Sequence, residues 1–323
     1  MKEPPPRTKK GRYVNPHIHN IRRKRRDFVL WMLGFYRDYP FQRVKPGFTY
    51  PVPDTPFSPE KPSATWIGHS TYLVSIGGRH ILTDPIWSNW CSPVPFVGPR
   101  RKRRAPVQLD DLPRIDYVLI SHDHYDHLDR RTVDRLHARY PDILWVVPQG
   151  VKKWFLSRGI KKIAELSWWE EIHIDSAFKV TCVPSQHFSG RKTKDLNRTL
   201  WGGYVVECLL WDKTFYFVGD TGYNKYHFKE IGEHFEKIDL SLIPIGSYSP
   251  RKFMAPVHIE PKDAVNIHMD VGSKLSLGMH WKTFRLSEEP TDQPPYDLLY
   301  AMKKQNLDPS SFLAIQPGEK VNW

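Results

Sequence analysis

The chain has 323 residues, 40% hydrophobic and 26% charged, which excludes a disordered or collagen-like protein and allows a large buried core. Its net charge of +13 is concentrated in two segments: residues 1–26 carry ten basic residues and one acidic residue, and residues 100–104 are all basic. The remaining chain is nearly neutral, so an anionic partner, either nucleic acid or a membrane surface, would bind these two segments.

The first segment of the chain, residues 1–59, is predicted to be a basic arm that precedes a compact domain over residues 60–323. We expect residues 1–27 to be poorly ordered. Six prolines over residues 46–62 indicate an extended linker.

Within this arm, apolar residues recur over residues 28–39 at the spacing of one helix face. Because a basic run, residues 22–26, precedes this face, such a helix could lie in a membrane interface. It could equally pack on the protein's own core. The apolar run itself is too short to span a bilayer. Residues 25–29 resemble a twin-arginine signal, but no cleavage site follows them.

Three widely spaced cysteines, Cys91, Cys182 and Cys208, form no CxxC pattern. A disulfide framework is therefore not expected, and a reducing compartment fits better. We expect a cytoplasmic protein with peripheral membrane association.

From residue 64 onward, short strand-like runs alternate with helical patterns, which predicts an α/β fold. Helices are expected over residues 129–140, 224–235 and 261–270. Neither GxGxxG nor GxxxxGK[ST] occurs, so nucleotide chemistry of those kinds is unsupported. The expected strands cover residues 64–76, 80–86, 116–121, 144–148, 178–184, 203–211, 214–220, 239–245, 274–280 and 312–317.

The most specific pattern is HxHxDH, which directly follows the apolar strand over residues 116–121. In an extended segment, side chains two positions apart share one face, so the first two imidazoles can reach one metal ion. The later Asp and His can turn toward a second ion. Three further candidates each follow a predicted strand, and strand-end loops are where an α/β sheet builds its site.

We assign His122, His124 and His187 to one ion and Asp126, His127 and His280 to the other, with Asp220 bridging the two. Nitrogen and oxygen ligands without thiolate suit Zn²⁺, and the same ligand types also accept Fe or Mn. Asp126 and Asp220 are the predicted catalytic carboxylates of this site.

Other side chains are candidates for supporting roles, each with an ordinary structural alternative. Asp84 could orient a ligating imidazole, or could simply be a turn residue. His69 could line the site or be packed under it. The candidates for substrate contact are Tyr248, Arg251, His258 and Arg191. A plain loop role explains the first two equally well, and a helix-cap position explains His258 equally well. For Arg191, solvated surface charge is the favoured explanation.

HxHxDH followed by His, Asp and His resembles the metallo-β-lactamase superfamily, whose fold is an αββα sandwich with a dinuclear metal site at one edge. More narrowly, the chain resembles the N-acylphosphatidylethanolamine-hydrolysing phospholipase D family over most of residues 60–320, at all seven ligand positions. The matching stretches include TWIGHSTYLV (65–74), DYVLISHDHYDHLD (116–129), PSQHFSGR (184–191), FVGDTGY (217–223) and HIEPKDAVNIHMD (258–270).

This resemblance implies a zinc phosphodiesterase that releases N-acylethanolamine and phosphatidate, and it also implies a homodimer. Two zinc ions would lower the pKa of a shared water to give a hydroxide that attacks phosphorus in line. The partners would be a phospholipid substrate and an anionic membrane surface.

Other functions are compatible with parts of this sequence pattern. A related hydrolase of a lactone or small phosphodiester would use the same fold. Nucleic-acid processing would use the two basic segments, but the apolar stripe beside the basic arm argues against it. The complete ligand set argues against a non-catalytic binding protein.

Overall fold

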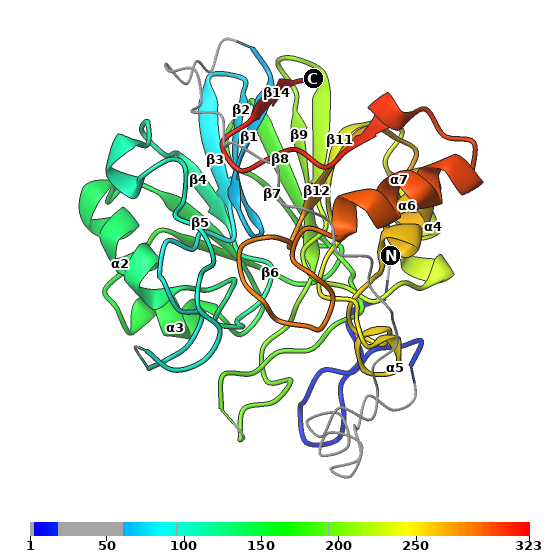
Figure 1. The fold of residues 1–323 in the computed structure, drawn as a ribbon. Helices are drawn as coiled ribbons and strands as arrows, with labels where there is room; N and C mark the ends of the chain where they lie inside the picture. The colour runs from blue at the N-terminus through cyan, green and yellow to red at the C-terminus, as the bar shows by residue number, and fades with distance from the viewer. Residues whose placement is uncertain (1–2, 19–60, 95, 193) are drawn as a thin grey trace.

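The computed structural model describes residues 3–18, 61–94, 96–192 and 194–323. In this part of the chain, two sheets pack face to face and helices cover their outer sides, which confirms the predicted αββα sandwich (Figure 1). The helix expected over residues 28–39 and nearly all of the proline-rich segment lie outside the described residues.

The first sheet has the strand order β14-β1-β2-β3-β4-β5-β6. Strands β3 to β6 are parallel, whereas β1, β2 and β14 join by antiparallel pairing. Helices α2 (Arg130–Arg139) and α3 (Lys152–Leu156) lie on its outer side (Figure 1). Its strands are β1 (Ser63–Gly68), β2 (Thr71–Ile76), β3 (Arg79–Thr83), β4 (Tyr117–Leu119), β5 (Leu144–Pro148), β6 (Ile163–Leu166) and β14 (Lys320–Asn322).

The second sheet has the order β13-β12-β11-β10-β9-β8-β7, with β10 to β13 parallel and β7 to β10 antiparallel. Its strands are β7 (Glu171–His173), β8 (Phe178–Val183), β9 (Gly203–Cys208), β10 (Lys213–Phe217), β11 (Ile238–Pro244), β12 (Ser273–Met279) and β13 (Phe312–Leu313). The helices of the second half are α4 (Lys225–His234), α5 (Arg251–Met254), α6 (Pro261–Asp270) and α7 (Pro294–Lys304), with a short 3-10 turn at Pro309–Ser311. Another 3-10 turn, Leu109–Asp111, lies between β3 and β4.

Alternating side chains explain why the inner strands are apolar throughout. In β4, Leu119 faces the core between the sheets, whereas Val118 belongs to the core under α2 and α3. In β5, Val146 and Trp145 divide in the same way. Because both faces of these strands are covered, they read as continuous apolar runs in the sequence.

The helices predicted over residues 129–140, 224–235 and 261–270 are confirmed, and α6 has the predicted bounds. Pro261 occupies its first turn, and Glu260 and Asp263 form a reciprocal capping box. The single strand expected over residues 64–76 is wrong, because the chain turns at His69 and forms the hairpin β1–β2. His69 has a positive φ of 54°, a conformation that sequence pattern does not announce for histidine.

A second correction concerns the start of the chain. Residues 3–18 were expected to be poorly ordered, but they pack against the domain. Tyr13 is almost fully buried there, and its backbone N–H donates to the carbonyl of Asn197. The described part of the predicted arm is therefore packed on the domain surface.

The structure also describes the cysteines and the helices that bear on disulfide formation and membrane spanning. All three cysteines are free and buried. Among the helices that the structure describes, none has the length and apolarity to cross a bilayer.

Candidate metal centre

The candidate ligands lie in loops that leave the carboxyl ends of strands at one edge of the sandwich. The HxHxDH loop follows β4, while His187, Asp220 and His280 follow β8, β10 and β12 of the other sheet. These three strands run in the same direction, since β8 and β10 are each antiparallel to β9, and β12 is parallel to β10 through β11. Both sheets therefore deliver side chains to one place.

Three imidazoles converge on one point. His122 Nε2 lies 2.8 Å from His124 Nδ1, and His187 Nε2 lies 3.3 Å from the same nitrogen. All three side chains are within reach of a single ion. His122 and His187 are fully buried, so their ring nitrogens face the site instead of bulk water.

A second cluster lies beside the first. His127 Nε2 is 3.3 Å from Asp126 Oδ2, and His280 Nε2 is 3.5 Å from the same oxygen. Asp220 Oδ2 lies between the clusters, 3.2 Å from the Nε2 atoms of both His127 and His280 and 3.8 Å from His187 Nε2. The structure thus brings all seven sequence-predicted ligands together.

Asp84 supports this cluster from behind. Its carboxylate is completely buried and accepts a hydrogen bond from His127 Nδ1 at 2.6 Å and from the backbone N–H of Ser121 at 2.7 Å. The Ser121 hydroxyl also donates to it. With Nδ1 donating to Asp84, the Nε2 atom of His127 is the ring nitrogen that faces Asp126 and Asp220 and that would coordinate a metal.

Electrostatics favour the metal-binding protonation state at some ligands and oppose it at others. Burial opposes a charge on His127 and His280, but the nearby Asp220 and Asp126 outweigh it, raising the pKa of His127 well above its ordinary value and that of His280 to about 9, so these two imidazoles would release a proton on binding a metal. Burial lowers the pKa of His122 well below its ordinary value, and the neighbouring His127 adds to this effect. Burial also opposes ionisation of Asp220, but His127 and His280 outweigh it and hold the pKa of this carboxyl well below its usual range. A neutral imidazole and an ionised carboxylate are the forms that coordinate metals.

Several polar atoms at the centre have no hydrogen-bond partner among the described residues. These buried atoms are His127 Nε2, His280 Nε2 and Asp220 Oδ1. A buried polar atom without a hydrogen-bond partner destabilises the folded state. The atoms at this centre are nitrogen and oxygen, and no thiolate is among them. A divalent metal fits this donor set and would satisfy these atoms.

Sequence reasoning left the place of His69 open. Its Nε2 lies 2.9 Å from Asp126 Oδ2, and it can join the cluster of Asp126, His127 and His280. It follows β1, which runs in the same direction as β3 and β4 and so ends at the same edge. The sequence did not signal this position, because a single strand was expected over residues 64–76.

The predicted substrate contacts lie in three different places. His258 is close to the centre, with Nδ1 3.8 Å from Asp220 Oδ2. Arg251 donates to the carbonyl of His258 at 3.0 Å and pairs with Asp263 at 2.8 Å, so it holds the His258 loop against α6. Arg251 therefore supports the site through the carbonyl of His258.

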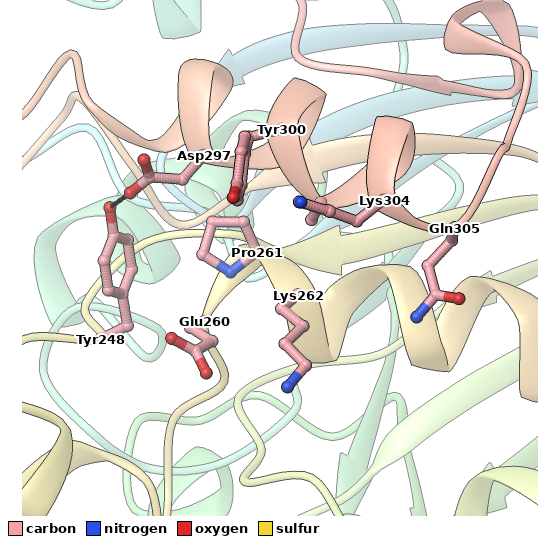
Figure 2. A pocket seen from close by; sticks show the side chains of 9 residues that line it. Tyr248, Glu260, Pro261, Lys262, Asp297, Tyr300, Lys304 and Gln305 are labelled. Atoms are coloured by element: carbon pink, nitrogen blue, oxygen red, sulfur yellow. Dashed lines mark hydrogen bonds between the residues drawn. The ribbon is translucent and has the colours of Figure 1, made fainter.

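Tyr248 faces a different cavity, of about 330 Å³, between the start of α6 and α7. Figure 2 shows its hydroxyl pointing at Asp297, to which it donates at 2.5 Å, while Lys262 and Lys304 extend from the two helices. None of the seven predicted ligands lines this cavity.

Arg191 lies beside the HxHxDH loop. Its guanidinium donates to the carbonyls of Asp123 at 2.9 Å and Leu128 at 2.7 Å, and it stacks on Tyr125 at 4.1 Å. It therefore fixes both ends of the loop that carries four predicted ligands.

Arg191 also lines an open cavity of about 610 Å³ next to this loop. The cavity has five cationic and two acidic side chains, an excess of three cations, together with aromatic rings. Such a lining suits an anionic group on an amphipathic molecule. The cationic residues are Arg130, Arg131, Arg158, Arg191 and Lys192, and the aromatic residues are Trp90, Tyr125 and Trp154.

Comparison with known proteins places these features in a family. The family model described as a beta-lactamase superfamily domain matches residues 79–281. The chain is 40% identical over 266 residues to N-acyl-phosphatidylethanolamine-hydrolyzing phospholipase D 1 of Caenorhabditis elegans, covering 79% of this chain and 74% of that protein. It is 35% identical over 229 residues to the mitochondrial N-acyl-phosphatidylethanolamine-hydrolyzing phospholipase D of Saccharomyces cerevisiae, covering 70% of this chain and 48% of that protein.

Solved structures share the fold at lower identity. A possible metal-dependent hydrolase from Veillonella parvula superposes with a TM-score of 0.66 at 18% identity, covering 81% of this chain and all of that chain. An isothiocyanate hydrolase from Delia radicum gut bacteria superposes with a TM-score of 0.62 at 20% identity, covering 81% of this chain and 99% of that chain. At these identities the likeness extends to the fold alone.

Proposed function

The chain belongs to the N-acylphosphatidylethanolamine-hydrolysing phospholipase D family of the metallo-β-lactamase superfamily, and from this membership we propose that it hydrolyses N-acylphosphatidylethanolamine to N-acylethanolamine and phosphatidate. As a member, it is a metal-dependent hydrolase of the phospholipase D type. The observation that carries the proposal is the pair of adjacent ligand clusters in a chain of this family.

The proposed ligands follow the two clusters. His122, His124 and His187 would hold one zinc ion, Asp126, His127 and His280 the other, with Asp220 shared. Bound zinc would supply an acidified water and would accept charge from the phosphoryl oxygens.

The chain's own residues orient this chemistry. Asp84 keeps the Nε2 face of His127 open to the site. His187 Nδ1 donates to the carbonyl of Val257 at 2.8 Å, which fixes that ring in the same way. The carboxylates of Asp126 and Asp220 would orient a nucleophilic water at the centre.

In this proposal, His258 and the cationic cavity bind parts of the phospholipid that the metal ions do not contact. The His258 ring is next to Asp220, where it can contact the phosphodiester. The excess positive charge along the cavity favours an anionic phospholipid over a neutral ester.

A peripheral membrane contact is proposed at the same face. Val94, Phe96 and Val97 are exposed by 51%, 82% and 58%, and they lie in the loop that follows two cavity-lining residues, Ser92 and Pro93. Apolar side chains beside arginines fit the interface of an anionic bilayer. A cytoplasmic location and a homodimer stay predictions.

Product identification tests the activity. Zinc-loaded protein is incubated with N-acylphosphatidylethanolamine in mixed micelles, and the products are identified by mass spectrometry beside a lactone and an RNA substrate. We expect N-acylethanolamine and phosphatidate in equal amounts, with His187→Ala as the inactive control. Hydrolysis of the lactone or RNA without any release of N-acylethanolamine would refute the proposed substrate.

A further inference from the structure

Residues 3–18, named here the N-terminal strap, lie against the loop that carries His187. The strap begins as a tight turn in which Arg7 and Tyr13 form a β-bridge, and Gly11 takes a φ of 71°. This turn lets Tyr13 and the residues after it run along the loop over residues 186–200.

Several contacts anchor the strap. The Tyr13 hydroxyl donates to Gln149 Oε1 at 2.7 Å, and the Arg7 guanidinium lies 4.1 Å above the Tyr13 ring. Arg12 donates to the carbonyls of Lys194 and Leu196. Side chains and backbone of the strap thus hold both the end of β5 and the far side of the His187 loop.

One strap side chain reaches the ligand residue itself. The amide Nδ2 of Asn15 donates to the backbone carbonyl of His187 at 2.8 Å, and Asn15 is 7% exposed. A parallel connection runs through Asn197, whose Nδ2 donates to the carbonyl of Tyr13 at 3.2 Å and whose Oδ1 accepts from the backbone N–H of Ser189 at 3.2 Å.

The backbone and the ring of His187 are therefore held from two sides. Asn15 fixes its carbonyl, and the carbonyl of Val257 fixes its Nδ1. With both fixed, Nε2 has one orientation, toward His124 Nδ1 and Asp220 Oδ2. In this arrangement the strap is an outer support of the candidate metal centre, although it lies 172 positions away in the sequence.

We propose that Asn15 is a positioning residue for the metal centre: through the strap, it holds His187 where it can coordinate the ion that it shares with His122 and His124. Loss of its donor would leave a buried carbonyl without a partner and free the backbone of His187 to shift. The inference rests on the proposed ligand role of His187, and it does not depend on the identity of the lipid.

Loss of the Asn15 donor should weaken the binding of one metal ion and not of the other. The second ion is proposed to bind Asp126, His127 and His280, which Asn15 does not contact. Loss of an outer-shell partner lowers metal affinity by about 10- to 100-fold, so one of the two ions should be weakened by that factor while the other is bound nearly as in the wild type. A strap that merely stabilised the fold would change both ions alike.

Full-length Asn15→Asp tests this inference, because aspartate keeps the size of asparagine but, when ionised, accepts hydrogen bonds only. Asn322→Ala, an exposed residue of β14 distant in sequence from the centre, is the matched control. Zinc content is measured by elemental analysis and affinity by competition with a chromogenic chelator, alongside His187→Ala. If Asn15→Asp fails to fold, Asn15→Ala is measured in its place.

The expected result is one ion lost from His187→Ala, one ion weakened about tenfold or more in Asn15→Asp, and wild-type binding in Asn322→Ala. Wild-type affinity for both ions in Asn15→Asp, or equal weakening of both, would overturn the positioning role while His187→Ala still loses an ion. Two tightly bound ions in His187→Ala would instead refute the ligand assignment under the proposed function.

Discussion

Replacing Asp84 with asparagine should weaken metal binding with almost no change in side-chain size. The carboxylate accepts from His127 Nδ1 at 2.6 Å, from the Ser121 N–H at 2.7 Å and from the Ser121 hydroxyl. Asparagine has one oxygen and one NH₂ group, so it cannot accept on both sides. If its NH₂ group faces His127, that imidazole must place its proton on Nε2, the atom that faces Asp126 and Asp220.

The size of the effect follows from these contacts. At least one hydrogen bond to a charged group is lost, and such bonds contribute about 1.5–3 kcal/mol. Loss of a partner that orients a ligating imidazole typically costs 10- to 100-fold in metal affinity, which corresponds to about 1.4–2.8 kcal/mol. The two ranges agree, so we expect Asp84→Asn to bind zinc at the His127 cluster at least tenfold more weakly.

Chelator competition at fixed pH measures this affinity directly. Asp142→Asn is the matched control, since the Asp142 side chain is 77% exposed and forms only a surface pair with Lys162. Circular dichroism verifies that each variant is folded. Zinc affinity of Asp84→Asn within threefold of the wild type would show that the hydrogen bond to His127 does not control the ligand, and the reasoning would fail.

Three further predictions test other parts of the structure. Asp220→Asn should lower zinc content below two ions per chain by elemental analysis, because its carboxylate faces both clusters; two retained ions would contradict the bridging role. The double variant Phe96→Ser, Arg131→Glu should reduce sedimentation with phosphatidylserine vesicles by about tenfold or more, since both side chains are exposed at the proposed membrane face; unchanged sedimentation would exclude that face. Burial lowers the pKa of His227 to about 3, below its ordinary value of 6.5, so the unfolded chain takes up a proton between these values that the folded chain does not. Stability is therefore lost as pH falls below 6.5, by about 1.4 kcal/mol per unit, and His227→Phe should flatten this loss in urea unfolding at pH 5.5 and 7.5; an unchanged pH dependence would refute it.

Local patterns predicted the parts of the structure that are set locally. The start of α6 follows from Pro261 and the capping pair Glu260 and Asp263, all within four positions. The turn at His69 was missed because the residue there adopts a positive φ that its neighbours do not signal. Helix α7 was also missed.

In the candidate site, too, the features set by local sequence were predicted and those set by distant packing were not. HxHxDH indicated a metal site because its residues are adjacent in sequence, and the later strand-end residues followed from the rule that strand ends share one edge. The contact of Asn15 with His187 depends on how the start of the chain packs on a distant loop, and no periodicity or motif encodes that packing. The ligand assignment itself stays a prediction until metal content is measured.

The origin of the ligands in both sheets has a consequence for folding. The HxHxDH loop belongs to the first sheet and the loops of His187, Asp220 and His280 to the second, so bound ions would cross-link the two halves of the sandwich. A ligand that binds only the folded state raises stability by about 2.7 kcal/mol when its concentration is 100 times its dissociation constant. Metal removal should then lower the melting temperature and make unfolding of the two sheets less cooperative. The stability of the fold would therefore depend on the zinc concentration.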